Sequence, residues 1–193
     1  HSSKCLIINS SNEIIFSTKN DFDIVFPRSA IKIFQAIPFA ESGAIEKFGL
    51  NKKQIALSCS SHVGENFHLK ELLTWFEKLR LPLKYLKCGI HNPIDQSSSN
   101  KLLLSGNKPT QMHNNCAGKH LAMLSSCIAN NYNIKSYLEF DHPHQKKIRK
   151  SIEYFSENKI KKNNFAIDGC SAPQYGLKIK DLANAMINLG DSI

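Results

Sequence analysis

The sequence predicts an α+β domain in which helices pack on an antiparallel sheet. Two observations predict it: short apolar segments around a polar turn open the chain, and helical periodicity dominates the rest. With 193 residues, 41% of them hydrophobic and 21% charged, the chain has the size and composition of one globular domain. No repeat or linker divides it, so we predict a single domain over residues 1–193.

The first elements are predicted to be strands. Residues 5–10 and 13–18 are largely apolar and flank a polar turn, a pattern typical of a hairpin, and an extended segment follows. From Ser29 onward, apolar residues recur at intervals of three and four, which predicts a helix. Ser29 is of a good N-cap type, and Pro38 is expected to end or kink this helix.

The remainder is predicted to be mainly helical. Residues 69–81 give the clearest amphipathic pattern, with acidic residues early and basic residues late. Three more helices are expected, over residues 118–131, 143–158 and 178–189. Residues 165–176 read as a short strand running into a Gly- and Pro-bearing loop, while 94–101 and 104–111 are interpreted as polar connections.

The formal charge of +9 raises the question of a nucleic-acid partner. Only three of the 25 basic residues are arginine, and the lysines are scattered, with the densest run at 159–164. Because nucleic-acid recognition relies on arginine side chains, we expect no nucleic-acid partner. No apolar run approaches the roughly 20 residues of a membrane span, so we expect no membrane partner either.

The six cysteines are widely and irregularly spaced, and no C-x-x-C motif occurs. In a chain of this length, such spacing favours reduced thiols over a disulfide framework, and hence a cytoplasmic location. One or two of these thiols remain candidate metal ligands.

The spacing Ser-x-x-Lys occurs four times, at Ser29/Lys32, Ser98/Lys101, Ser105/Lys108 and Ser156/Lys159. It places a hydroxyl and an amine one helical turn apart, where a desolvated lysine can take the serine proton. Only the first pair heads an apolar helix. Ser29 is therefore a candidate nucleophile with Lys32 as its base; the alternative is an N-cap serine beside a solvated lysine.

Residues 58–68 form a second cluster, in which hydroxyls, a thiol, a carboxyl and two imidazoles crowd together. A glycine-marked bend after small hydroxyl residues suits the wall of a pocket. The alternative interpretation is a helix start, with the serines capping the helix at 69–81.

A third cluster combines thiols with nitrogen donors. Cys116 and Lys119 lie one helical turn apart, and Cys170 lies in a tight loop some fifty residues later. Thiolates with a nitrogen ligand suit zinc, for which His113 or His120 would be the conventional third ligand. Two buried free cysteines are the alternative.

Five ordered stretches resemble a known family: FPRSAIKIFQAIPFAESGA, SCSSHVGENFH, CGIHNP, HNNCAGKHLAML and DGCSAP. Their order and spacing resemble those of bacterial L-asparaginases of the thermolabile, zinc-associated type first described from rhizobia. The resemblance covers nearly the whole chain, from His1 to the last helix. It implies a fold similar to that of serine β-lactamases and glutaminases, and an amidohydrolase that converts L-asparagine to L-aspartate and ammonia.

The resemblance also implies roles for individual residues. Ser29 and Lys32 match the first catalytic pair, and Ser61 matches a second catalytic serine that is a rival for the nucleophile. The substrate pocket is expected to be lined by Arg28, His120 and Asp168. Charge complementarity assigns the substrate's α-carboxylate to Arg28 and its α-ammonium to Asp168.

The implied cofactor is Zn²⁺, with Cys116, Lys119 and Cys170 as ligands. A lysine ligand has to bind as the neutral amine, which the nearby metal charge favours. The metal would orient the substrate or fix the loop at Asp168.

One departure concerns the ends of the chain. The family's opening strand would precede His1 and its second catalytic lysine would follow Ile193, so we expect an internal portion of a longer protein, in which a missing base would weaken catalysis. The alternatives left open are a hydrolase of glutamine or of β-lactams, and a non-catalytic zinc-binding remnant. The sequence does not fix the oligomeric state, and a homodimer is among the assemblies left open.

Overall fold

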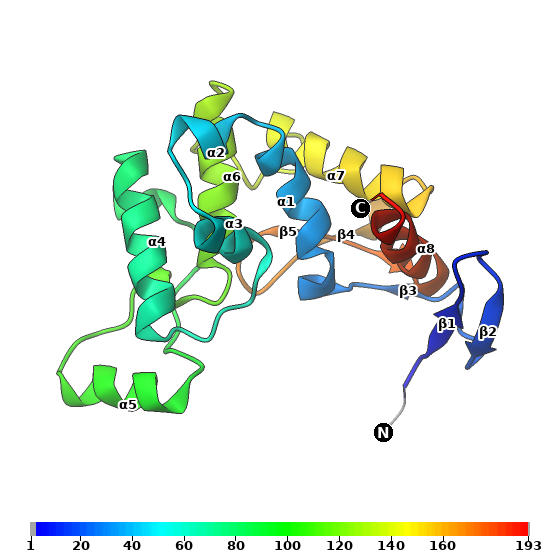
Figure 1. The fold of residues 1–193 in the computed structure, drawn as a ribbon, viewed down its shortest axis with the longest axis horizontal. Coiled ribbons are helices and arrows are strands. Elements are labelled where there is room, and N and C mark those ends of the chain that lie inside the picture. The colour runs from blue at the N-terminus through cyan, green and yellow to red at the C-terminus, as the bar shows by residue number, and fades with distance from the viewer. Residues whose placement is uncertain (1–2, 193) are drawn as a thin grey trace.

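The computed structural model describes residues 3–192 and has the mixed helix and strand content of an α+β fold (Figure 1). The strands are β1 (Leu6–Ile8), β2 (Ile14–Ser17), β3 (Ile24–Val25), β4 (Phe165–Ile167), β5 (Pro173–Tyr175) and β6 (Leu177–Lys178). The helices are α1 (Lys32–Ala40), α2 (Ala44–Lys47), α3 (Lys52–Cys59), α4 (Asn66–Leu79), α5 (Gln96–Leu104), α6 (Ala117–Ala129), α7 (Pro143–Ser156) and α8 (Ile179–Gly190).

The strands differ from the single sheet that the sequence predicts. In the described part of the chain they pair as three separate two-stranded antiparallel sheets: β1 with β2, β3 with β6, and β4 with β5. The predicted hairpin is confirmed as β1–β2. The β3–β6 pair joins residues 24–25 to 177–178, and it therefore brings the segment before α1 close to the loop that carries Cys170.

The predicted helices are confirmed, with ends shifted by a few residues, whereas the sequence predicts neither α2, α3 nor α5. The interpretation of residues 94–101 as a polar connection is wrong, because α5 begins at Gln96. The side chain of Asp95 accepts a hydrogen bond from the Ser98 N–H and so caps the helix. α3 begins with a capping box between Asn51 and Gln54.

The core lies around α6, almost every residue of which is buried. α1, α3, α4 and α2 pack against this helix, while α7 packs on α1 and α8 (Figure 1). Trp75 of α4 is fully buried, stacks near Phe39 and donates its indole N–H to Ser125 of α6. The sites described below are built on the ends of the helices that converge on α6.

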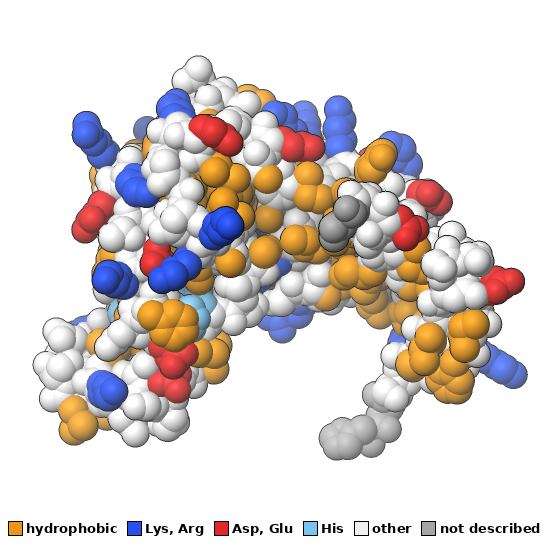
Figure 2. All heavy atoms as spheres, viewed as in Figure 1, with side chains coloured by type: hydrophobic (Ala, Val, Ile, Leu, Met, Phe, Trp, Pro, Cys, Tyr) orange, Lys and Arg blue, Asp and Glu red, His pale blue; other side chains and the backbone are white. Residues whose placement is uncertain are grey.

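The β1–β2 hairpin lies at the opposite end of the molecule from α4 and α5 (Figure 1). Figure 2 shows hydrophobic side chains gathered on its surface, among them those of Ile14, Ile15 and Phe16, which are about half exposed or more. Among residues 3–192, none of the helices combines the length and the apolar character that crossing a bilayer requires.

Candidate active site

Three side chains that are distant in sequence form a hydrogen-bonded row. Lys32 Nζ lies 2.7 Å from Ser61 Oγ and also donates to the Ser60 carbonyl at 2.7 Å. Ser61 Oγ lies 3.1 Å from Ser29 Oγ. Both hydroxyls are at the surface, whereas the side chain of Lys32 is buried beneath them. The structure thus brings the three predicted catalytic residues together, with Ser61 between Ser29 and the amine.

The local backbone explains this arrangement. Residues Arg28–Ile31 form one turn of 3-10 helix before α1, and the Ser29 side chain caps neither helix. Its hydroxyl therefore stays free to meet Ser61, and the interpretation of Ser29 as an N-cap is wrong. α3 ends at Cys59, and the extended Ser60 brings Ser61 to the start of α1, where its hydroxyl meets Lys32.

Lys32 is in an environment that favours the neutral amine. Burial lowers the pKa of Lys32 below its usual value of 10.5; the nearby Cys116 thiol opposes this shift, and the positive charge of Lys119 adds to it. A lysine with a lowered pKa is a better proton acceptor near neutral pH.

The other Ser-x-x-Lys pairs lack this environment. Lys101 and Lys108 are exposed, and the side chain of Lys159 is 87% exposed. Burial therefore separates Lys32 from the three lysines that share its spacing. The alternative interpretation of the motif, in which the lysine is exposed to solvent, is therefore wrong for Lys32.

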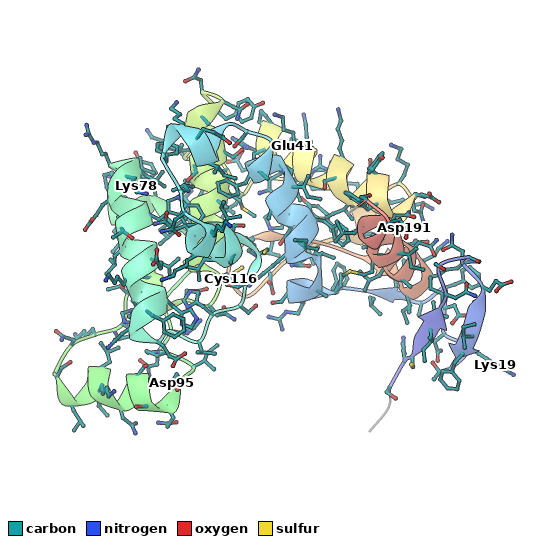
Figure 3. The ribbon with its side chains drawn as sticks, in the orientation of Figure 1. Lys19, Glu41, Lys78, Asp95, Cys116 and Asp191 are labelled. Carbon is teal, nitrogen blue, oxygen red and sulfur yellow. The ribbon has the colours of Figure 1, made fainter. Side chains whose placement is uncertain are left out.

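The thiol–amine cluster adjoins the row of hydroxyls. Lys119 Nζ lies 3.3 Å from Cys170 Sγ, and Cys116, Lys119 and Cys170 are all buried. A hydrogen bond from the Cys170 thiol lowers the pKa of Cys116 to about 6, and the same bond together with burial raises the pKa of Cys170 to about 11. These shifts favour a Cys116 thiolate that accepts a hydrogen bond from a protonated Cys170. Figure 3 shows Cys116 in the middle of the helical part, among α1, α3 and α6.

The donor set fits zinc by its chemistry. Two sulfurs and one amine converge, and the Nε2 atom of His120, which is buried beside Cys170, has no hydrogen-bond partner among the described residues. Within residues 3–192, no group of three or more His, Cys, Asp or Glu side chains could hold a metal ion, so a site here depends on the lysine.

Arg28 and Asp168 form an ion pair at the edge of this region. Arg28 Nε donates to Asp168 Oδ1 at 3.0 Å, and the Asp168 side chain is mostly buried while that of Arg28 is 69% exposed. Although burial raises the pKa of Asp168, the Gly169 N–H, Lys119 and Arg28 together lower it. Arg28 adopts a positive φ of 51°, a conformation that costs a non-glycine residue roughly 1 kcal/mol. Its carbonyl accepts a hydrogen bond from the Gln174 side chain, which helps to hold this conformation.

His120, the remaining predicted site residue, is fully buried. Its Nδ1 lies 2.7 Å from the Tyr137 hydroxyl, and that hydroxyl accepts the Lys87 N–H at 3.0 Å. No motif in the sequence indicates Tyr137, which stands in the irregular connection between α6 and α7. Its phenol fixes the orientation of the His120 ring, leaving Nε2 on the side of Cys170.

An amine held behind two surface hydroxyls in an α+β domain is typical of a hydrolase that works through a nucleophilic side chain. Comparison with family models then gives the particular family. The family model described as L-asparaginase II matches residues 1–192, so the chain belongs to this family. Membership indicates an amidohydrolase of the L-asparaginase type acting on a small-molecule substrate. No curated protein matches the chain.

Proposed function

We propose that this chain provides the catalytic centre of an amidohydrolase that converts L-asparagine to L-aspartate and ammonia through a serine ester. The observation that carries the proposal is the hydrogen-bonded row from Ser29 through Ser61 to the buried amine of Lys32. Family membership supports the choice of substrate.

In the first step, Ser29 Oγ attacks the carbon of the side-chain amide. Its proton passes to Ser61 Oγ, and the proton of Ser61 passes to the neutral amine of Lys32, since the two contacts of 3.1 and 2.7 Å connect these atoms in series. The C–N bond then breaks, and the ammonium of Lys32 returns a proton so that ammonia leaves. Water hydrolyses the β-aspartyl ester by the same relay run again.

Ser61 is the second candidate for the nucleophile, because it is Ser61 that contacts Lys32 directly. In that case Ser29 Oγ hydrogen-bonds the reacting carbonyl or the attacking hydroxyl. Trapping the ester separates the two roles: mass spectrometry of a slowly turned-over substrate should locate the acyl group on the peptide containing Ser29. An acyl group on the peptide containing Ser61 would reverse the assignment.

Arg28 and Asp168 are proposed to hold the two charges of the substrate's amino-acid end. They already form an ion pair with each other, so a zwitterion with a carboxylate and an ammonium can insert between them without leaving a charge unpaired. The exposed position of Arg28 leaves its guanidinium free to reach a carboxylate.

Cys116, Lys119 and Cys170 are proposed to hold Zn²⁺, with the lysine bound as the neutral amine. When bound, zinc would supply a positive charge that polarises a nearby oxygen. Independently of the metal, the N–H of Gly169 and the thiol of Cys170 both approach the Asp168 carboxylate, which fixes this loop for the substrate.

The test is ammonia release measured across L-asparagine, L-glutamine and a β-lactam. We expect turnover of L-asparagine, and a loss of several orders of magnitude in kcat in both Ser29→Ala and Ser61→Ala. Preferred hydrolysis of glutamine or of the β-lactam would redirect the substrate assignment. Near-normal turnover by Ser29→Ala would show that Ser29 is not the nucleophile, and zinc binding without turnover of any substrate would favour a non-catalytic protein.

A further inference from the structure

The backbone of Arg28 is strained, and its conformation depends on contacts with other parts of the chain. Its φ of 51° lies in the left-handed region, where a residue other than glycine stays only if its surroundings hold it. Most of its side chain is exposed, so packing of that side chain contributes little to holding it. Because the proposed function assigns the substrate's α-carboxylate to Arg28, the groups that hold this residue also affect substrate binding.

One β-hairpin contacts Arg28 at two points. β4 and β5 pair antiparallel, and the Asp168 N–H donates to the Ala172 carbonyl at 2.9 Å across the loop that joins them. Asp168 Oδ1 accepts the Arg28 Nε–H at 3.0 Å, just beyond the end of β4. Gln174, in the middle of β5, donates its side-chain amide to the Arg28 carbonyl at 3.3 Å. The first contact holds the side chain of Arg28, and the second holds its backbone.

Gln174 is itself firmly held, with a side chain that is 2% exposed. The residues on either side of it are bonded to helices. The Pro173 carbonyl accepts the Gln35 amide of α1 at 3.4 Å, and the Tyr175 hydroxyl donates to Gln145 of α7 at 3.1 Å. Figure 1 shows β4 and β5 passing behind α1, in agreement with the first of these bonds. Gln174 is therefore a fixed hydrogen-bond donor.

A bound substrate would make the two contacts unequal. A zwitterion that inserts between Arg28 and Asp168 supplies its own carboxylate to the guanidinium, so the ion pair within the protein is lost. The hydrogen bond from Gln174 does not compete with the substrate, because it joins a buried amide to a backbone carbonyl. It is then the contact that still connects Arg28 to the hairpin while the substrate is bound.

We propose that Gln174 is a positioning residue for substrate binding, which keeps Arg28 in the conformation in which its guanidinium meets the substrate's α-carboxylate. This inference rests on the proposed function for the role of Arg28. Gln174 acts on the end of the substrate that does not react, and the row from Ser29 through Ser61 to Lys32 does not include it. Its loss should therefore raise KM and leave kcat close to the native value.

The test uses L-aspartate as the probe, because this proposed product carries the α-carboxylate and the α-ammonium and is not turned over. Gln174→Met keeps the length of the side chain but removes the donor. The Kd for L-aspartate, measured by NMR titration, and the KM for L-asparagine should each rise about three- to tenfold, the value of one hydrogen bond. Gln35→Met is the matched control: it removes the other buried amide that contacts this hairpin, does not contact Arg28, and should leave Kd unchanged. An unchanged Kd in Gln174→Met would overturn the proposal.

A double-mutant cycle tests whether Gln174 acts through Arg28. In the Arg28→Met background, Gln174→Met should weaken L-aspartate binding no further, and an equal weakening there would refute the proposal. Absence of saturable binding to the native protein would also refute it, because Arg28 would then hold no carboxylate. Failure of the proposed function alone looks different: L-aspartate binds and responds to Gln174→Met, but L-asparagine releases no ammonia. If Gln174→Met does not fold, Gln174→Asn, whose amide is one methylene shorter, gives the same comparison.

Discussion

Replacing Lys32 by methionine tests the proposed mechanism most directly. Methionine has a similar length and leaves Ser29 and Ser61 in place, but it cannot accept a proton. The row of hydroxyls then ends at Ser61, because the contact of 2.7 Å to the amine is lost. A positioned general base contributes about 10²- to 10⁴-fold to a rate, so kcat should fall by that factor. This corresponds to about 3–5 kcal/mol of activation free energy.

The same substitution should have a smaller effect on folding. It removes an amine whose burial is costly, which stabilises the folded state, and it breaks the hydrogen bonds to Ser60 and Ser61. At about 1 kcal/mol for each hydrogen bond, these opposing effects should leave the free energy of unfolding within about 2 kcal/mol of the native value. Circular dichroism during urea unfolding measures this quantity, and saturating initial rates of ammonia release measure kcat.

Lys101→Met is the matched control, since Lys101 follows Ser98 with the same spacing but is exposed on α5. It should keep the native kcat and stability. A Lys32→Met variant that folds and retains kcat within about tenfold of the native value would refute the role of Lys32 as base. An equal loss in both variants would show that the loss has nothing to do with the buried site.

Three further predictions concern the metal, acid stability and packing. Cys170→Ala should lose stoichiometric zinc in elemental analysis while Cys127→Ala, which removes another buried thiol, should keep it; full retention in both would contradict the proposed ligands. Burial lowers the pKa of His144 to about 3, so the unfolded chain binds more protons below about pH 6.5. The folded state is therefore not destabilised by this residue above that pH, and it loses free energy of unfolding as the pH falls towards 3. The total loss is about 4–5 kcal/mol. Urea unfolding of His144→Asn should lack this pH dependence. Gly118→Ala places a methyl group 2.1 Å from the Leu57 carbonyl oxygen, so α3 and α6 must separate, and thermal unfolding should show a loss of about 3 kcal/mol or more; a native melting temperature would disprove this close approach.

The helices that the sequence predicts best are those whose burial follows a helical period. α4 and α7 each bury one face, and the predicted ranges agree with the observed ones to within a few residues. α5 escaped prediction because it buries no residue: its apolar Leu103 and Leu104 are exposed, and its sequence reads as a polar connection. Only the cap at Asp95 signals this helix in the sequence, and one cap alone is a weak signal.

The pairing of the strands could not be predicted from the sequence, for a different reason. Each strand has only two to four residues, which is too short for a pattern of alternating side chains to select its partner. β3 pairs with β6 across most of the chain, and such a contact depends on how the helices between them pack. Local periodicity carries no information about it.

The convergence of Ser29, Ser61 and Lys32 agrees with the sequence prediction, but their order could not be predicted. The position of Lys32 on an apolar helix distinguished its motif from three others of equal spacing, and the structure buries this lysine alone among the four. That Ser61 would stand between Ser29 and the amine could not be read from spacing, since it depends on the extended conformation of Ser60 after α3. The contact between Tyr137 and His120 likewise depends on tertiary packing.

Gly118 explains physically why the hydroxyls and the thiols form one region. α3 ends just before Ser60 and Ser61, and α6 begins just after Cys116, so their separation decides whether the two groups meet. Because residue 118 has no side chain, the backbone of α6 can approach the Leu57 carbonyl more closely than any other residue would permit. α1 packs against both helices. Its first residue, Lys32, hydrogen-bonds the Ser61 hydroxyl and interacts electrostatically with the Cys116 sulfur. A change that widens this one contact should therefore weaken the relay and the thiol–amine cluster together, although Gly118 contributes no side chain to either.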